Sequence, residues 1–470
     1  MNVLLRSGSK RTLALESHSH VLLFRYIKET RKSAIELVPK NEFIDKQYKQ
    51  LSRSKSRSHG FLGLIEMNGD VFLCVITSKI TVATPIDGES VNKIVDVEFH
   101  SLTNDVWDFL DLNSNGYPNI DNDLQNSDPS TSSSSSLHIP QHPCYELRKL
   151  LTDGSFFYSS NFDLTSTLQN RGIGNQRLSV DKFHTDYMWN SFMMEGILAY
   201  RDNLLENQRR ILDNDQFLTT VIRGFAQTLE IYIKGIPSQL TIISKQSWKR
   251  AGTRFNVRGV DDDGNVANFV ETEIIFNNLS KGQIYSFVQI RGSIPVFWEQ
   301  DTALISPKVQ ITRSSQATQP TFEKHFENLK SKYGPIHCVN LRSATRSSEI
   351  ELSNTYKKHF ISMNDKSQNH DSFFFTDFDF HVETSKTYAD ATKILPLLQE
   401  SFDEFGYFLY DCKRNTILRE QVGAFRTNCL DCLDRTNVIQ QVISLKALTD
   451  YLHSQKINDF TVIKECHSTL

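Results

Sequence analysis

One stretch of the chain combines residue types that together could transfer a phosphoryl group. It reads RTNCLDCLDRTN from residue 426 to residue 437, so five residues separate Cys429 from Arg435. A loop of this length between a strand and a helix can point its backbone N–H groups inward and hold a phosphate. The inward N–H groups and the positive end of the helix dipole also favour the nucleophilic thiolate form of Cys429. The planar guanidinium of Arg435 can bind two phosphate oxygens. The spacing therefore predicts transfer through a phosphocysteine.

The rest of the loop supplies candidates for the other roles. We expect the substrate phosphate to be surrounded by the positions nearest Cys429 and Arg435, which are Leu430, Cys432, Leu433, Asp434 and Thr436. The leaving oxygen needs a proton, and a carboxyl group beside a thiolate and a phosphate should have a raised pKa. We assign this acid to Asp431, because only one residue separates it from Cys429. There are three alternatives for this acid: Asp434, His381, or an acid on another loop of the chain.

The segments around the loop predict the elements that position it. Residues 421–425 can form a strand before the loop, and residues 436–453 give a long amphipathic helix after it. Three other interpretations of the two cysteines remain: buried thiols, half of a zinc site, or a thioredoxin-like redox pair. A zinc site would need a second C-x2-C or H-x3-H pair, which the sequence lacks, so we expect no metal and no cofactor. A redox pair gives no role to the acids or to Arg435.

Composition restricts the class of protein. The chain has 470 residues, 52 Lys and Arg against 55 Asp and Glu, and a net charge of −3. This balance argues against a nucleic-acid binder, and no apolar run approaches the ~18 residues of a membrane-spanning helix. Seven cysteines, an odd number, indicate free thiols in a reducing compartment. We therefore expect a cytoplasmic multidomain protein.

The pattern along the chain predicts two domains. Residues 1–178 are predicted to be β-rich, with a hairpin over 60–84, a strand at 156–158 and a disordered serine-rich insert at 113–136. Residues 179–470 alternate between strand and helix patterns, which is typical of an α/β domain. The expected strands are 239–243, 284–290 and 373–380, and the expected helices are one beginning near 186 and those over 320–333, 390–406 and 436–453. The overall fold class is thus α/β with a β-rich N-terminal domain.

Four blocks of sequence together resemble one known family. They are RAGTRFNVRG and DDGNVANFVETE within residues 250–273, QIRGSIPVFWEQ at 289–300, DFH at 379–381, and the loop at 426–437. These blocks are similar to those of the Sac-type phosphoinositide phosphatases, and closest to the Sac domain of synaptojanin-like proteins, including fungal ones. The resemblance covers about residues 180–445, whereas the first 175 residues match only loosely.

The resemblance implies a fold and a function. It implies a β-rich Sac-specific domain packed on an α/β phosphatase domain that removes phosphate from phosphatidylinositol phosphates without a metal. It places the enzyme on cytosolic membrane faces as a peripheral protein that acts in membrane trafficking and endocytosis. It also implies that an inositol 5-phosphatase domain follows in the full-length protein, so we expect this chain to be a fragment. The alternatives are a protein tyrosine phosphatase and a catalytically weak scaffold with the same fold.

Charge on the loop predicts which lipids are substrates. The loop has no cation between Cys429 and Arg435, and a second phosphate on an adjacent ring position would face Asp431 or Asp434. We therefore expect phosphatidylinositol 4-phosphate and 3-phosphate to be preferred, the 3,5-bisphosphate to be tolerated, and the 4,5-bisphosphate to be poor. The family resemblance points the same way.

Two arginines outside the loop are further candidates for contact with lipid phosphates. The pattern of residues 253–260 predicts a strand with Arg254 and Arg258 on one face, returning through residues 266–273 as a hairpin. The alternative is that these arginines pair with Glu271 or Glu273 across the hairpin. His381 follows an apolar strand and is either a neighbour of the active site or a core histidine.

Overall fold

The structure is a computed structural model, and its contacts divide the chain into two compact units. It describes residues 1–8, 11–51, 58–108, 112, 114–118, 141–173, 183–233, 235–253, 256–301, 308–342, 347–366, 372–428 and 434–457. Unit 1 comprises Met1–Thr81, Asn92–Leu164 and Asn190–Val221, and unit 2 comprises Val82–Val91, Thr165–Trp189 and Ile222–Leu470. Because the units interleave along the chain, a single domain boundary at residue 178 stays a prediction. The predicted disordered insert lies almost entirely outside the described residues.

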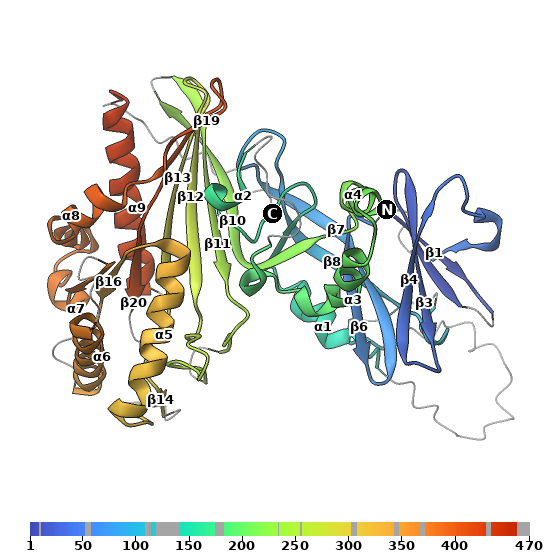
Figure 1. Ribbon diagram of the computed structural model, residues 1–470, viewed down its shortest axis with the longest axis horizontal. Coiled ribbons are helices and arrows are strands. Elements are labelled where there is room, and N and C mark those ends of the chain that lie inside the picture. Colours follow the sequence, from blue (N-terminus) through green and yellow to red (C-terminus); the bar gives the residue numbers. More distant parts are fainter. Residues whose placement is uncertain are drawn as a thin grey trace, which may run out of the picture. The chain divides into compact units, whose positions relative to one another are not determined.

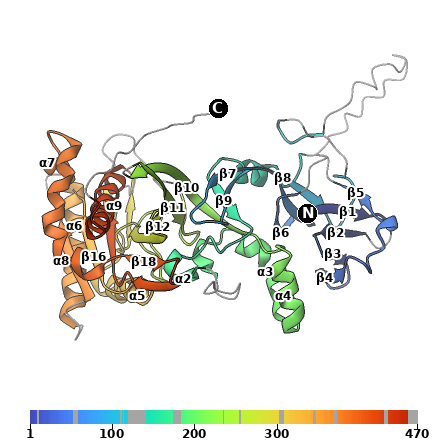
Figure 2. The same cartoon turned by 90° about the horizontal axis from the view of Figure 1, so that it is seen from above.

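Unit 1 is built mainly from strands. Its first sheet has the order β4-β3-β2-β1-β5, and its second contains β9-β8-β7-β6 in that order; Figure 2 shows β1 to β5 grouped apart from β6 and β8. The strands are β1 (Asn2–Arg6), β2 (Thr12–Glu16), β3 (His20–Ile27), β4 (Lys32–Pro39), β5 (Lys49–Gln50), β6 (Gly60–Met67), β7 (Asp70–Ala83), β8 (Val91–Ser101) and β9 (Phe156–Ser159). The helices are α1 (Tyr145–Leu151), α3 (Ser191–Asp202) and α4 (Glu206–Asn214), with a 3₁₀ turn at Asp45–Gln47.

The hairpin predicted from residues 60–84 is confirmed as β6 and β7, which pair antiparallel. Asn68 and Gly69 connect them with φ angles of 54° and 85°. Positive φ at both central residues is what a tight two-residue turn between right-twisted strands requires, and Asn-Gly tolerates it best. The predicted strand at 156–158 is also confirmed, as β9.

Unit 2 contains a mixed sheet whose parallel part ends at the predicted loop. The order along its main path is β17-β16-β20-β13-β12-β11-β10. β10 (Thr220–Ile233), β11 (Ile236–Gln246), β12 (Val270–Asn278) and β13 (Gln283–Arg291) pair antiparallel. β20 (Ala424–Asn428), β16 (Ile336–Asn340) and β17 (Phe373–Asp377) then continue parallel to β13. β18 (Phe408–Asp411) and β19 (Thr416–Arg419) extend from β13, and β14 (Trp298–Gln300) pairs with β15 (Val309–Ile311).

Helices cover both faces of the parallel strands (Figure 1). α8 (Leu395–Phe405) and α9 (Asp434–Ser454) share one apolar core with Phe425 of β20. α5 (Ser315–Tyr333) and α6 (Ser347–Lys366) share the other with Ala424, the preceding residue. Successive strand residues face opposite sides, so β20 is buried from both. The remaining helical elements are α2 (Leu168–Arg171), α7 (Phe380–Glu383) and 3₁₀ turns at Thr185–Tyr187 and Tyr388–Ile394. The predicted α/β class is confirmed.

Three predicted elements need correction. The proposed hairpin over 253–273 is wrong: among the described residues only a single bridge, Val260 to Val266, pairs these segments, and β12 begins at Val270. The strand expected over 373–380 ends at Asp377, because a new helix follows it. The side chain of Asp379 caps this helix by accepting hydrogen bonds from the backbone amides of His381 and Val382. The helix expected from about residue 186 begins only at Ser191, as α3, after a 3₁₀ turn at Thr185–Tyr187.

Candidate active site

The parallel strands of unit 2 all end at one edge of the sheet. Asn340, the last residue of β16, lies opposite Asp377 of β17 and Asn428 of β20, and Arg291 ends β13 opposite Thr427. In open α/β sheets ligands bind in the crevice at the carboxyl ends of parallel strands. The loop that was predicted to hold phosphate leaves the sheet at this edge.

The helix predicted after the loop is confirmed, and a strand precedes the loop, but β20 lies three residues later than the predicted 421–425. β20 ends at Asn428, and α9, which is 21 residues long, begins at Asp434. Asp434 is exposed and Thr436 is buried. The positive end of the α9 dipole therefore lies at the end of the loop, where it favours an anion. The central residues of the prediction, Cys429, Leu430, Asp431, Cys432 and Leu433, lie outside the described residues, so their roles stay predictions.

Arg435 is held at the strand edge by two oxygen atoms. Its Nη1 donates hydrogen bonds to the Leu341 carbonyl and to Oε2 of Glu349, both at 3.2 Å. The side chain of Arg435 is 13% exposed, whereas that of Glu349 is 1% exposed. Oε2 of Glu349 is also 3.8 Å from Nε of Arg342, which is fully buried. A buried carboxylate thus lies between two guanidinium groups next to the loop.

A network of amide side chains fixes the residue from which the loop departs. Nδ2 of Asn428 donates to Oδ1 of Asn340 at 3.0 Å. Asn340 in turn donates to Ser353 Oγ at 2.7 Å and to Asp377 Oδ1 at 2.8 Å. The backbone amide of Leu341 donates to the Asn428 carbonyl at 2.9 Å. Because Asn340 and Asn428 are both buried, these contacts define one arrangement of the three strand ends.

Arg426, the first arginine of the matched loop sequence, has a structural position. It is fully buried on β20, and its Nη2 donates to the Ser293 carbonyl at 2.7 Å. Burial, reinforced by the positive charge of Arg426, lowers the pKa of His325 well below its usual range. Arg426 therefore ties β20 to the segment that follows β13.

The matched blocks at 250–273 and 289–300 pack together beside this edge. The Gly259 amide donates to Ser293 Oγ at 3.0 Å, and the Ser293 amide donates to the Ala267 carbonyl at 3.1 Å. A Cβ on Gly292 would come within 2.8 Å of Val266 Cγ2, so glycine is required where the two blocks meet. Arg291, the residue before it, donates to the side chain of Asn437 on α9. The blocks thus support the end of β13 and the first turn of α9.

The other predicted site residues differ in position. Arg258 is buried, donates to Gln300 at 2.6 Å and lies 5.6 Å from the ring of Trp298; the structure does not bring it to the strand edge as an exposed phosphate ligand. For Arg258 the alternative pairing with Glu271 or Glu273 is wrong, because among the described residues Glu271 pairs with Lys245 and Glu273 accepts from Ser286. Arg254 lies outside the described residues.

His381 is exposed on α7, just after β17 at the same edge of the sheet. Its backbone amide donates to the capping Asp379. The core interpretation of this histidine is therefore wrong, and a role as a neighbour of the active site stays a prediction. Sequence reasoning missed Glu349, Arg342 and Asn340, which the fold brings to the same edge.

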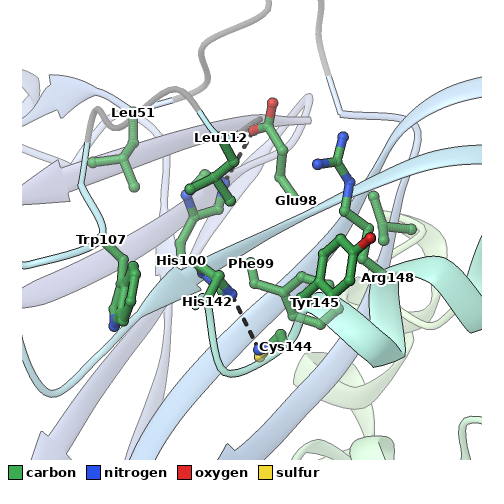
Figure 3. Close-up of a pocket in the computed structure, with 11 residues that line it drawn as sticks. Leu51, Glu98, Phe99, His100, Trp107, Leu112, His142, Cys144, Tyr145 and Arg148 are labelled. Atoms are coloured by element: carbon green, nitrogen blue, oxygen red, sulfur yellow. Dashed lines mark hydrogen bonds and ion pairs between the residues drawn. The ribbon is translucent and has the colours of Figure 1, made fainter. Parts of the chain in front are cut away.

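Unit 1 contains a separate cavity whose lining includes Glu98, two histidines and Cys144. The cavity has a volume of about 220 Å³. Oε2 of Glu98 lies 3.4 Å from Nε2 of His100 there, and the Cys144 amide donates to His142 Nδ1 (Figure 3). Burial raises the pKa of the Cys144 thiol to about 12, so this cysteine is a poor nucleophile at neutral pH. Within the described ranges no three His, Cys, Asp or Glu side chains are grouped so that they could hold a metal ion.

Fold and site define an α/β protein with a C-x5-R loop between a parallel strand and a helix. A comparison with family models matches residues 59–385 to the SacI homology domain. The match covers well over half of the chain, and this protein therefore belongs to the SacI homology domain family.

Individual relatives agree with this assignment. The chain is 50% identical over 463 residues to the polyphosphatidylinositol phosphatase INP53 of Saccharomyces cerevisiae, covering 97% of this chain and 41% of the yeast protein. It is 39% identical over 476 residues to the inositol-1,4,5-trisphosphate 5-phosphatase 1 of Schizosaccharomyces pombe, covering 100% of this chain and 43% of that protein. It is 34% identical over 317 residues to rat synaptojanin-1, covering 66% and 18% of the two chains. The chain thus spans about two fifths of the length of its two fungal relatives.

Proposed function

We propose that this protein is a phosphoinositide phosphatase that works through a phosphocysteine. Cys429 attacks phosphorus, Arg435 and the amides of the loop hold the phosphoryl oxygens, and Asp431 gives its proton to the inositol oxygen as the P–O bond breaks. Water then displaces Cys429, which releases inorganic phosphate and restores the thiolate. No metal or cofactor takes part in this scheme.

The observation that carries the proposal is the position of Arg435. Its guanidinium is fixed at the carboxyl edge of the parallel strands, in the first turn of α9, by contacts to Leu341 and Glu349. This position sets a cation and the positive end of a helix beside the loop that contains Cys429. The names of the relatives, which include a polyphosphatidylinositol phosphatase, support phosphoinositides as the substrate class.

The preference among lipids depends on more charges than the loop contains. Three arginines, Arg291, Arg342 and Arg435, lie at the strand edge together with the carboxylates of Glu349 and Asp377. A charge count of the loop alone omitted all of them, so it does not by itself disfavour a second phosphate. We retain the 4-phosphate and 3-phosphate as preferred substrates, with the 3,5-bisphosphate tolerated and the 4,5-bisphosphate poor, on the family resemblance.

The cellular setting is part of the same proposal. Phosphoinositides lie in membranes, so the protein would act as a peripheral protein on cytosolic membrane faces, in trafficking and endocytosis. Among the described residues no helix has both the length and the apolar character needed to cross a bilayer. A linked inositol 5-phosphatase domain in the full-length protein rests on the resemblance and on the name of the fission-yeast relative.

Phosphate release from vesicles tests the proposal. The substrates are the 4-phosphate, 3-phosphate, 3,5-bisphosphate and 4,5-bisphosphate lipids at matched surface charge, with a phosphotyrosine peptide as the competing class. We expect release from the monophosphates, its loss in Cys429→Ser, and no loss in Cys412→Ser, which changes an exposed cysteine. Release from the peptide alone would indicate a tyrosine phosphatase, and no release from any substrate would indicate a scaffold.

A further inference from the structure

A buried carboxylate connects two arginines at the candidate active site. Glu349 lies in the first turn of α6 and is 1% exposed. Its Oε2 is 3.2 Å from Nη1 of Arg435 and 3.8 Å from Nε of Arg342. Arg342 follows the end of β16 by two residues, and Arg435 lies in the first turn of α9. One carboxylate of α6 therefore contacts both the end of a strand and the start of a second helix.

Such an arrangement needs a reason beyond stability. Removing charged groups from water is costly, and a buried ion pair often stabilises a fold no better than apolar side chains of the same size. Two guanidinium groups close together would also repel each other without a counter-charge between them. A carboxylate that keeps two arginines at the edge where phosphate is expected would, however, help the protein to bind that phosphate.

We infer that Glu349 is a positioning residue that sets the orientation of the Arg435 guanidinium for phosphate binding. This inference rests on the proposed function, because it assigns a role in the same reaction. The guanidinium is planar, and contacts from Glu349 and the Leu341 carbonyl to one nitrogen restrict both its place and its plane. Orientation fixed before the substrate arrives lowers the barrier of a reaction that develops charge on the phosphoryl oxygens.

A competing role, in which Glu349 hinders phosphate binding, can be distinguished from positioning. If Glu349 competed with phosphate for Arg435, its removal would strengthen phosphate binding. The structure favours positioning, because Glu349 is almost fully buried and is held by Arg342 as well. Its carboxylate is therefore shielded from solvent, whereas the Arg435 side chain keeps 13% of its surface exposed.

The test compares Glu349→Ala and Glu349→Asp with a matched control. Glu89→Gln changes another fully buried carboxylate of unit 2. Oε2 of Glu89 accepts a hydrogen bond from Nη2 of Arg171 at 2.7 Å, and neither residue belongs to the elements at the strand edge. For Glu349→Ala we expect kcat on 4-phosphate vesicles to fall about 10- to 100-fold with a smaller change in KM, the usual effect of losing a partner that orients a ligand group. Glu349→Asp keeps the charge and should recover part of this loss, and it serves if the alanine variant does not fold. Glu89→Gln should lower the melting temperature and leave kcat within about twofold, because neither Glu89 nor Arg171 belongs to the strands and helices that meet at the strand edge.

A second readout does not require turnover. Orthovanadate resembles the transition state of phosphoryl transfer, and its binding can be followed by the protection of Cys429 from alkylation by iodoacetate. We expect protection to weaken in Glu349→Ala by about the same factor as kcat/KM, and protection by inorganic phosphate to weaken less. Unchanged turnover and unchanged vanadate protection, or tighter binding of either anion, would overturn the inference. If the wild-type protein released phosphate from none of the lipids, but Glu349→Ala still weakened vanadate protection of Cys429, the proposed substrate would be refuted and the positioning role would be retained.

Discussion

The amide network at the strand edge gives a prediction whose size follows from the structure. Asn340→Ala removes three side-chain hydrogen bonds, to Asn428, Ser353 and Asp377. The Asp377 carboxylate is 45% exposed, and Ser353 is partly exposed, so water can replace their lost partner. The amide of Asn428 is fully buried and has no such replacement. Leaving one buried donor without a partner costs about 1–3 kcal/mol, and each solvated contact costs about 1 kcal/mol or less.

The expected total is therefore roughly 2–4 kcal/mol of unfolding free energy. Activity should also fall, because Asn428 is the residue from which the loop leaves the sheet, and a displacement of about 1 Å at a catalytic group can cost about 100-fold in rate. We expect kcat/KM on vesicles to fall by about tenfold or more. Ser353→Ala, which removes one solvated partner of the same amide, is the matched control and should change both quantities little.

A double-mutant cycle makes the reasoning refutable. If the main cost is the stranded amide of Asn428, Asn428→Ala should remove most of the additional loss caused by Asn340→Ala, with a coupling of about 1 kcal/mol or more. Urea unfolding followed by circular dichroism, together with vesicle assays on the four proteins, measures both effects. Additive losses of stability would show that the two amides act independently, and the network would then have no role in fixing the loop.

Three other predictions concern the loop arginine, pH and thiol reactivity. Arg435→Lys keeps the charge but loses the planar fork, so kcat should fall about 100-fold; a loss of less than threefold in vesicle assays would contradict the assigned role. Burial lowers the pKa of His337 to about 4, so this histidine is neutral in the folded state and charged in the unfolded state between about pH 4 and pH 6.5. Its contribution to stability should be complete above pH 6.5 and should decline by up to about 3 kcal/mol as pH falls to 4; unchanged acid sensitivity in His337→Gln would oppose this. Burial raises the pKa of the Cys144 and Cys338 thiols to about 12 and about 11, so limited iodoacetamide at pH 7 should alkylate Cys429 before either of them, as peptide mass spectrometry would show.

The parts of the fold that sequence predicted have strong local patterns. The Asn-Gly turn with apolar strands on both sides specified β6 and β7, and the spacing of apolar residues after Arg435 specified α9. The strand–loop–helix context of Cys429 followed from the same local evidence. These elements depend on contacts between residues close in sequence, which is why periodicity identifies them.

The failures come from backbone geometry and from long-range contacts. Residues 253–260 alternate as a strand does, but the amide of Asn256 donates to the Thr253 carbonyl in a turn, and Gly259 has a φ of 65°. The alternation over these eight residues was therefore accidental. Arg258, which was assigned to the polar face of the predicted strand, is instead buried against Trp298. β16 was missed because a buried strand of only five residues has no alternating pattern to detect.

Glu349 shows why the supporting residues of a site are harder to predict than its nucleophile. It lies in a polar stretch of α6 that has the pattern of a solvated helix face, and it precedes Arg435 by 86 positions in the sequence. Only the parallel order of β16, β20 and β13 brings β16, and with it the start of α6, next to the start of α9. A C-x5-R spacing states which residues can do chemistry, whereas the position of Arg435 is decided by a carboxylate and a carbonyl from other elements. The catalytic potential of the loop is therefore a local property of the sequence, and its orientation is a property of the sheet.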